Sequence, residues 1–302
     1  MKEIVLITGG SGLIATKLAK MLTPDHSVRF LTREIKNEND FEWDLTRSYI
    51  DPAALMGIDH IVHLAGANIS GKRWTKSYKN EIINSRKESA SLILNTLQKN
   101  GIRIKSFISA SAIGYYDPNN RYVVNTEEAP KGEGFLSEVV DQWEKSADQF
   151  LSAGIAERVV KIRTGVVLDS QKGALPKMVL PIQFFVGAPL GDGKQYMPWI
   201  HIQDICNLYK YVIENAHLEG VFNGVAPQHC TNKEITKEIG RILHKPVWMP
   251  NIPKIFLQIL FGESSSILLD GSKVSSEKIQ KEGFMFQFKN IHEALNNLLS
   301  KN

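Results

Sequence analysis

Short runs of apolar residues alternate along the chain with longer segments whose apolar residues recur every three or four positions. The first run, Ile4 to Ile7, has the continuous apolar character of a parallel strand that is covered on both faces. Further strands are predicted over residues 28–32, 41–44, 60–65, 106–110, 158–162 and 221–225. The segment 41–44 is short and is predicted to lie at the edge of the sheet.

Amphipathic helices are predicted between these strands. The longest runs from about Lys79 to Lys99 and places its apolar residues on one face. Other helices begin at Leu13, after the first strand, and cover residues 135–151 and 204–214. Strands that alternate with helices form βαβ units and a mainly parallel sheet. The sequence therefore predicts an α/β protein with a Rossmann-type, doubly wound parallel sheet.

The regular alternation loosens from about Thr164. Residues 187–193 are predicted to form a loop, and the tail after Pro227 mixes short helical segments with proline-rich turns. A second, smaller unit on the substrate side of the sheet is therefore expected. The predicted division is a Rossmann domain over residues 1–165, completed by about 201–226, and a small substrate-side domain formed by residues 166–200 and 227–302.

A glycine-rich turn joins the first strand to the first helix. Gly9 permits a tight turn, Gly12 lets the backbone approach a pyrophosphate, and Ala15 lets the helix pack closely on the strand. The free N–H groups and the positive dipole end of the helix then face the phosphates. Because many glycine turns bind nothing, other positions must support this interpretation. The residues assigned to phosphate binding are Thr8, Gly9, Ser11, Gly12, Leu13 and Ile14.

Three further segments follow strand ends in the correct chain order. They are Arg33, Leu64 to Gly66, and Ser109 to Ser111. Ligands of open parallel sheets bind beyond the carboxyl ends of the strands. We therefore assign the following residues to the cofactor site: Arg33, Leu64, Ala65, Gly66 and Ser109.

Arg33 bears on which cofactor is bound. An arginine at the end of the second strand can pair with the 2′-phosphate of NADP, whereas an acid there would bind the ribose hydroxyl of NAD. Arg33 therefore favours NADP, while the neighbouring Glu34 keeps NAD as an alternative. The other interpretation is that Arg33 is a solvated side chain at a strand end and binds no cofactor. Asp44, after the third strand, can accept from the adenine amino group or cap a turn.

Composition bears on which partners and which location are expected. The 302 residues are 43% hydrophobic and 23% charged, and the net charge of +4 comes without a basic block, so no nucleic-acid partner is expected. Cys206 and Cys230 form neither a CxxC pair nor a disulfide framework, so the expected location of the protein is the reducing cytoplasm. No run approaches the roughly 18 apolar residues of a membrane span, so no membrane partner is expected.

Thr8 to Ile14, His63 to Gly66 and Ser109 to Ala112 resemble the extended short-chain dehydrogenase/reductases, the NAD(P)-dependent epimerase/dehydratase family. Five further segments are similar to the atypical YfcH-type epimerase family proteins: residues 71–74, 111–116, 163–168, 199–202 and 262–265. The resemblance extends over nearly the whole chain. It implies a Rossmann fold, an NAD(P) cofactor, and Ser111 at the position of the family's catalytic serine.

One departure from the family pattern concerns catalysis. The enzymes of this group use a Tyr-x-x-x-Lys pair as acid/base, but none of the eight tyrosines here is followed by a lysine four residues later. Phe135 and Val139 stand at the matching positions. Because a phenyl ring transfers no proton and a valine lowers no pKa, the usual mechanism is not expected.

Other side chains could take the missing role. Tyr115 and Tyr116 follow the serine strand and act either as acids beside Ser111 or as aromatic walls. Glu138 is either an acid/base group or a solvated glutamate. Arg163, which we assign to the cofactor site, could also receive an anionic substrate group or form a structural ion pair. No metal-ligand spacing is found, so no metal site is expected.

Two functions remain open from the sequence. The first is an oxidoreductase or epimerase-like enzyme that binds NADP(H) and acts on an unidentified small molecule, with Ser111 and Tyr115 or Tyr116 assisting. The second is a non-catalytic NADP(H)-binding sensor or scaffold, which the replacements Phe135 and Val139 favour. Related proteins often dimerise through helices beside the sheet, so either a monomer or a homodimer is expected.

Overall fold

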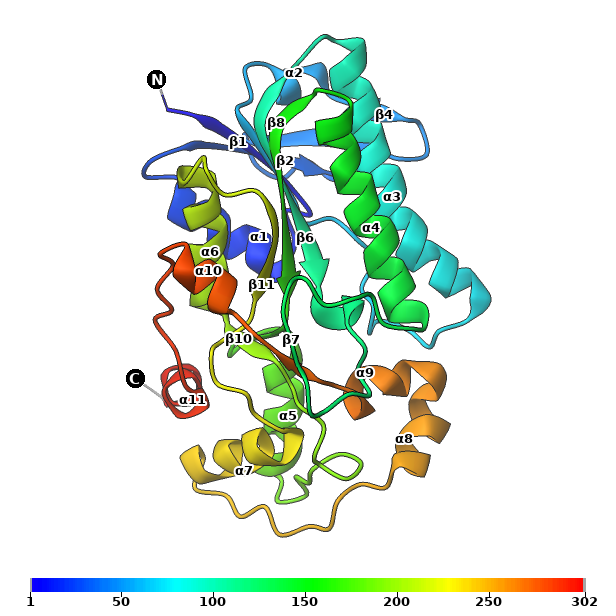
Figure 1. Cartoon of the computed structure of the whole chain (residues 1–302), viewed down its shortest axis with the longest axis vertical. Helices are drawn as coiled ribbons and strands as arrows, with labels where there is room; N and C mark the ends of the chain where they lie inside the picture. Colours follow the sequence, from blue (N-terminus) through cyan, green and yellow to red (C-terminus); the bar gives the residue numbers. More distant parts are fainter. Residues whose placement is uncertain (1, 301–302) are drawn as a thin grey trace.

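A computed structural model describes residues 2–300, and its centre is an eight-stranded sheet (Figure 1). In chain order the strands are β1 (Ile4–Thr8), β2 (Ser27–Thr32), β3 (Asp40–Asp44), β4 (Tyr49–Ile50), β5 (His60–His63), β6 (Ile104–Ala112), β8 (Ala156–Thr164) and β11 (Gly220–Gly224). Across the sheet the order is β11-β8-β6-β5-β1-β2-β3-β4. Every neighbouring pair is parallel except β3 with β4. The predicted Rossmann-type α/β fold is therefore confirmed.

Helices cover both faces of this sheet. The α-helices are α1 (Leu13–Leu22), α2 (Pro52–Leu55), α3 (Lys76–Lys99), α4 (Phe135–Ser152), α5 (Ala174–Gln183), α6 (Ile202–Glu214), α7 (Asn232–Ile242), α8 (Lys254–Phe261), α9 (Ser266–Leu269), α10 (Glu277–Lys281) and α11 (Ile291–Leu299). Two 3₁₀ turns, η1 (Ile113–Tyr115) and η2 (Gly262–Ser265), complete the set. The pair α3 and α4 packs on one face and the pair α1 and α6 on the other, so two apolar cores sandwich the sheet (Figure 1).

Capping residues explain where two helices begin. Helix α3 starts at Lys76, earlier than predicted, because the Thr75 side chain accepts a hydrogen bond from the Tyr78 amide. Helix α6 starts at Ile202 because His201 Nδ1 accepts from the Gln203 amide at 3.0 Å. Both helices therefore begin directly after a capping residue. The hydrophobic pattern alone predicted both helix starts two or three residues too late.

One edge of the sheet differs from the prediction. Residues 41–44 belong to β3, as expected, but this strand is not the edge. The two-residue β4 covers it in antiparallel register, with Trp43 opposite Ile50. A strand of two residues leaves no hydrophobic period that a sequence pattern could show. At the other edge, β11 rejoins the sheet beside β8, as predicted.

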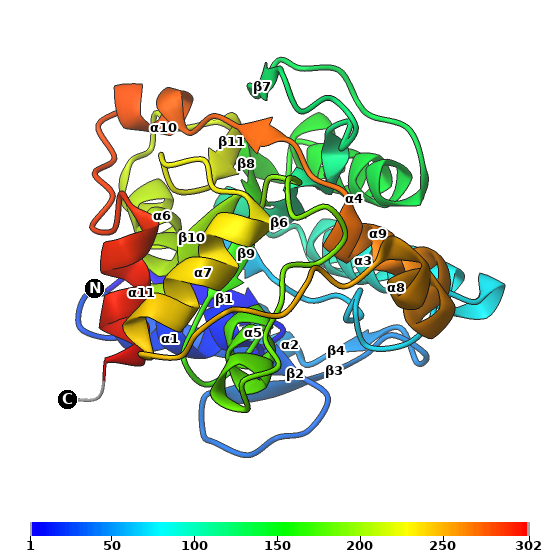
Figure 2. The ribbon, with the colours of Figure 1, turned by 90° about the horizontal axis from the view of Figure 1, so that it is seen from below.

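The chain outside the main sheet forms two small parallel sheets and a group of short helices. Strand β9 (Val166–Leu168) pairs with β10 (Trp199–His201), and β7 (Val124–Asn125) pairs with β12 (Lys273–Val274). Helices α5, α7 and α8 lie in the lower part of the molecule (Figure 1), and the view from below shows α11 beside α7 (Figure 2). Across residues 2–300, no helix is both long and apolar enough to cross a bilayer.

Four of the described histidines are buried, and burial strongly shifts the pKa of two of them, His63 and His201. His63 is fully buried at the end of β5, and His201 stacks on Phe288 with ring centroids 3.8 Å apart. Burial disfavours the charged imidazolium and lowers the pKa of these two histidines from 6.5 to about 4. Both rings are therefore neutral at pH 7, and the unfolded chain binds more protons than the folded one between these two values.

This difference predicts acid sensitivity. As the pH falls from 7 to 5, His63 and His201 should each lower the free energy of unfolding by about 2 kcal/mol. Urea unfolding at the two pH values measures the loss. In His201→Asn, whose side-chain amide can still cap α6, the loss of unfolding free energy should be smaller by the contribution of His201, about 2 kcal/mol. His217→Gln, at an exposed site, is the control and should keep the wild-type pH dependence. An equal pH dependence in all three proteins would contradict the prediction.

Candidate functional site

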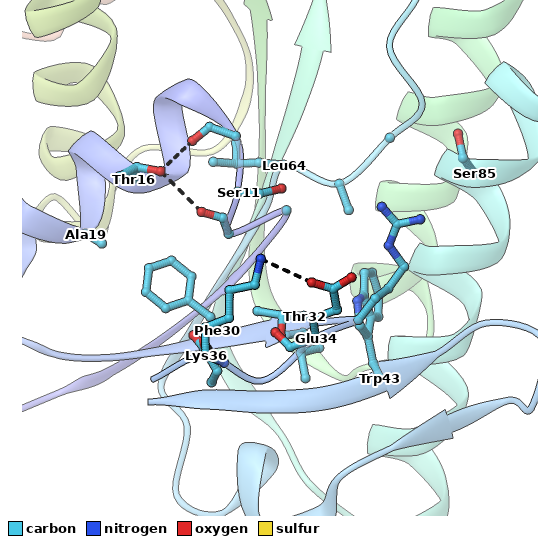
Figure 3. Close-up of a pocket in the computed structure, with 18 of the residues that line it drawn as sticks. Ser11, Thr16, Ala19, Phe30, Thr32, Glu34, Lys36, Trp43, Leu64 and Ser85 are labelled. Carbon is cyan, nitrogen blue, oxygen red and sulfur yellow. Dashed lines mark hydrogen bonds and ion pairs between the residues drawn. The ribbon is translucent and has the colours of Figure 1, made fainter. Parts of the chain in front are cut away.

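A cavity of about 1150 Å³ opens at the carboxyl ends of β1, β2 and β5 (Figure 3). Its wall includes the turn from Gly9 to Gly12, the residues Thr32 to Glu34 after β2, and the segment from Leu64 to Asn68 after β5. These are three of the four strand ends that the sequence analysis singled out, whereas Ser109 to Ser111 do not line the cavity. A parallel sheet brings them together because its strands all end on the same side.

The glycines of the β1–α1 turn are required by close contacts. Gly9 has a φ of +73°, and a Cβ atom there would lie 3.1 Å from the backbone of Leu64 and Ala65. A Cβ atom on Gly10 would meet the Phe30 ring at 2.9 Å. Larger residues would thus push the turn away from the β5 loop and from β2. The turn holds its backbone at the cavity wall.

The N-terminus of α1 is bare. Its N-cap residue is Gly12, which offers no side chain to the first amides, and the first turn contains no acidic residue. The single hydroxyl proton of Thr16 is shared between the carbonyl oxygens of Gly12, at 2.9 Å, and Gly10, at 3.3 Å, so this side chain leaves the amides free (Figure 3). Unpaired amides and the helix dipole together favour an anion at this end of the cavity.

A buried hydrogen-bond network fixes the β1 turn against the β5 loop. Thr8 Oγ1 accepts from the amides of Leu64 and Ala65, each at 3.0 Å, and lies 2.9 Å from His63 Nδ1. Since both lone pairs of the hydroxyl are used, its proton is donated to Nδ1. The ring proton of His63 is then on Nε2, 3.1 Å from Ser89 Oγ. The assigned residue Thr8 thus lies under the cavity and positions its wall.

The floor beyond β2 carries positive charge. The Arg33 side chain is exposed at the cavity, and it makes no hydrogen bond or ion pair within residues 2–300. Its neighbour Glu34 pairs with Lys36 at 3.1 Å (Figure 3). The lining residues Phe30, Lys36 and Trp43 were not predicted, because nothing in the hydrophobic pattern tells which strand residues face a cavity.

Several assigned residues lie outside the cavity wall. The Asp44 carboxylate binds Thr46 and Arg47, which hold the pKa of Asp44 below its ordinary value. It therefore caps a turn, the plainer of the two predicted roles. Ser109 is buried and donates to the Ala110 carbonyl. Leu13 and Ile14 belong to the first turn of α1 and pack against the core beneath it. Gly9, Ser11, Gly12, Arg33, Leu64, Ala65 and Gly66 line the cavity.

The residues predicted to be catalytic meet in a second, buried cluster. Ser111 Oγ donates to Glu144 at 2.6 Å, and Glu144 also receives two hydrogen bonds from Arg163 at 2.8 and 2.9 Å. Tyr116 donates to Asn223 at 2.6 Å and accepts from Arg163 at 3.0 Å. Ser111 and Arg163 are each 97% buried. Arg163 is thus in a structural ion pair rather than at the cavity wall.

Within this cluster the hydroxyl groups differ in availability. Burial raises the pKa of Tyr116 to about 12, and both its proton and a lone pair have partners. Tyr115 is only partly buried, and the guanidinium carbon of Arg163 lies 3.5 Å from the centre of its ring. Its hydroxyl has no hydrogen-bond partner within residues 2–300. Tyr115 is therefore the one of the three predicted groups whose proton is not already committed.

Apolar packing fills the place of the missing acid/base pair. Phe135 packs edge-on against Trp74 with ring centroids 4.8 Å apart, and Val139 is buried beside Trp74 and Ile82. Glu138 points to solvent and pairs with Lys131. The carboxylate in reach of Ser111 is instead Glu144, which the sequence interpretation missed. Its signal was a charged residue on the apolar stripe of α4. In the described residues, no three His, Cys, Asp or Glu side chains gather as a metal site would require.

Comparisons with known proteins identify relatives of this chain. Residues 5–134 match the profile of the NAD dependent epimerase/dehydratase family, and residues 252–298 match a domain of unknown function, DUF1731. The epimerase family protein YfhF of Bacillus subtilis is 34% identical over 302 residues, with 98% of each chain covered. The Arabidopsis thaliana protein described as an SDR39U1 homolog is also 34% identical, over 96% of this chain and 85% of its own.

A solved structure is similar over the whole length. The human epimerase family protein SDR39U1 (isoform 2), crystallised with NADPH, superposes with a TM-score of 0.87 at 31% identity, and 98% of each chain is covered. The YfhF match and this one both exceed 30% identity and cover 98% of this chain, so they include the glycine turn and the C-terminal helices. This chain belongs to the NAD dependent epimerase/dehydratase family, among its epimerase family proteins.

Proposed function

We propose that this protein binds NADP(H) in the cavity between the bare N-terminus of α1 and Arg33. The observation that carries the proposal is the pairing of an anion-binding helix end with an unpaired guanidinium across one cavity. The amides after Gly12 would hold the diphosphate, and Arg33 would pair with the 2′-phosphate. The NADPH in the related human structure supports the same cofactor.

The reaction that this site supports best is hydride transfer on a small molecule. The nicotinamide supplies the hydride or accepts it, and a protein group must exchange a proton with the substrate oxygen. Tyr115 takes that role in our proposal, because its hydroxyl is free whereas those of Ser111 and Tyr116 are committed. Arg163 and Glu144 position the tyrosine by holding the guanidinium against its ring.

A non-catalytic NADP(H) sensor is the second candidate. It is favoured by the apolar packing of Phe135 and Val139, where related enzymes hold their acid/base pair. The cofactor cavity does not depend on these two residues, since neither lines it. A protein could therefore lose catalysis at α4 and keep its nucleotide.

The cofactor preference can be tested on Arg33. Arg33→Ala should weaken NADPH binding by roughly 1–3 kcal/mol, the cost of one charge-assisted contact, and leave NADH binding nearly unchanged. Fluorescence titration with both nucleotides measures the two dissociation constants. Lys87→Ala removes an exposed cation that does not line the cavity, and it serves as the control. Equal losses for NADPH and NADH in Arg33→Ala would show that Arg33 does not recognise the phosphate.

A pair of tyrosine variants separates the two functions. Tyr115→Phe should lower kcat by about 10²–10⁴-fold without changing the dissociation constant of NADPH. Tyr116→Phe should instead lower the unfolding free energy by about 1–3 kcal/mol, because it leaves the buried Asn223 Oδ1 without its donor and removes one acceptor of Arg163. Turnover is followed by NADPH absorbance with a panel of aldehydes and ketones. If the wild-type protein binds NADPH but oxidises it with none of them, the sensor is the better description.

A further inference from the structure

Exposed apolar side chains concentrate at the lower end of the molecule. Of the nineteen large apolar side chains that are exposed in the described chain, ten belong to α5 and its C-terminal turn, to the segment before α8, and to α8 itself. We call these ten residues the apolar face: Leu180, Phe184, Phe185, Val186, Trp248, Ile255, Phe256, Ile259, Leu260 and Phe261. Large apolar patches on a protein surface mark sites of interaction.

These residues come from segments that are joined to one another. The loop after α5 runs beside the segment before α8, because the Gly191 amide donates to the Ile252 carbonyl and the Ile252 amide donates to Pro189. Lys245 Nζ lies 4.1 Å from the centre of the Phe185 ring, which links the end of α5 to the same segment. Helices α5 and α8 both lie in the lower part of the molecule in Figure 1, away from α2.

Helix α8 is unusual because it exposes most of its apolar residues. Its sequence is Lys-Ile-Phe-Leu-Gln-Ile-Leu-Phe, and Leu257 is its only buried residue. An ordinary surface helix keeps its apolar stripe on the core and its charges outside. Here the outward residues include Phe256, Ile259 and Leu260, each about two-thirds exposed. Such an exposed apolar helix is typical of an interaction site.

The charged residues within the two segments that carry this face have one sign. Residues 170–191 and 239–262 contain five lysines and arginines but no aspartate or glutamate. Arg241 is paired with Glu238, whereas the four lysines form no ion pair within residues 2–300. The acids that flank the two segments are themselves engaged. Asp192 pairs with Arg121, and Glu263 pairs with Lys79.

This charge pattern decides between two kinds of occupant. A second copy of the chain would bring the same lysines face to face, since a two-fold interface presents one surface to itself. Like charges in that arrangement repel. An anionic lipid surface instead attracts lysines and accepts exposed Trp, Phe, Ile and Leu side chains at its boundary. The absence of a spanning helix does not bear on such a contact.

We propose that the apolar face docks on an anionic lipid bilayer. Helix α8 lies in the plane of the interface, with Phe256, Ile259 and Leu260 inserted among the acyl chains. Lys245 and Lys254 contact the lipid phosphates. The sequence analysis predicted no membrane partner, because no apolar run is long enough to span a bilayer. The contact proposed here is peripheral and forms only when the fold brings the two acid-free segments together.

Vesicle flotation tests the proposal with the full-length protein. The protein should float with vesicles of phosphatidylcholine containing about a third phosphatidylglycerol, and much less with phosphatidylcholine alone. Binding should fall at high salt, because screening weakens the attraction of the lysines. Replacing Lys245 and Lys254 by glutamine should weaken binding about fivefold for each lysine.

A matched pair of variants tests the apolar contact. Phe256→Ser with Ile259→Ser should reduce flotation at least tenfold, whereas Met56→Ser should not. Met56 and Ile259 are both 67% exposed, but Met56 follows α2 at the opposite end. Thermal unfolding and NADPH titration establish that each variant is folded, so a failure of docking is distinguished from a failure of cofactor binding.

Three results would overturn the proposal. The first is no flotation of the wild-type protein with anionic vesicles. The second is equal flotation with neutral and anionic vesicles, which would remove the role of the lysines. The third is a dimer in sedimentation velocity without lipid that Phe256→Ser with Ile259→Ser abolishes, because a second copy would then cover the face.

Discussion

The Thr8 hydroxyl has one proton and two lone pairs, and all three are used where β1 meets the β5 loop. Its oxygen accepts from the amides of Leu64 and Ala65, and its proton goes to a neutral His63. These bonds hold the loop against Gly9, where there is no room for a Cβ atom. The shape of the cavity depends on this junction, because the loop on one side and the bare end of α1 on the other are its two walls.

Local patterns in the sequence predicted most of the sheet and the cavity. Apolar runs located β1, β2, β5, β6, β8 and β11, and the glycine spacing located the turn. Long-range pairings could not be read in the same way. Glu144 and Arg163 lie on different elements, and only the packing of α4 on β8 joins them, so Arg163 was assigned to the cofactor site rather than to an ion pair. His201 caps α6 while the Asp204 carboxylate accepts from the amides of Gln287 and Phe288, a contact across 83 residues or more.

The nucleotide cavity and the cluster around Ser111 differ in whether their polar groups have partners. The nucleotide cavity presents unpaired donors, namely helix amides and Arg33, to an anion. The cluster around Ser111 is closed, because its hydroxyl, carboxylate and guanidinium groups satisfy one another inside the protein. A buried charge pair of this kind costs several kcal/mol if one member is removed. The cluster therefore first stabilises the junction of α4 with the sheet, and Tyr115 alone projects a free hydroxyl from it.

A crystal structure of the protein grown with NADPH tests the central claim most directly. The account predicts diphosphate oxygens within hydrogen-bond distance of the amides that follow Gly12, with the 2′-phosphate beside the Arg33 guanidinium. Nucleotide density elsewhere on the protein would contradict it. So would a diphosphate in the cavity whose oxygens contact side chains but none of the amides at the start of α1.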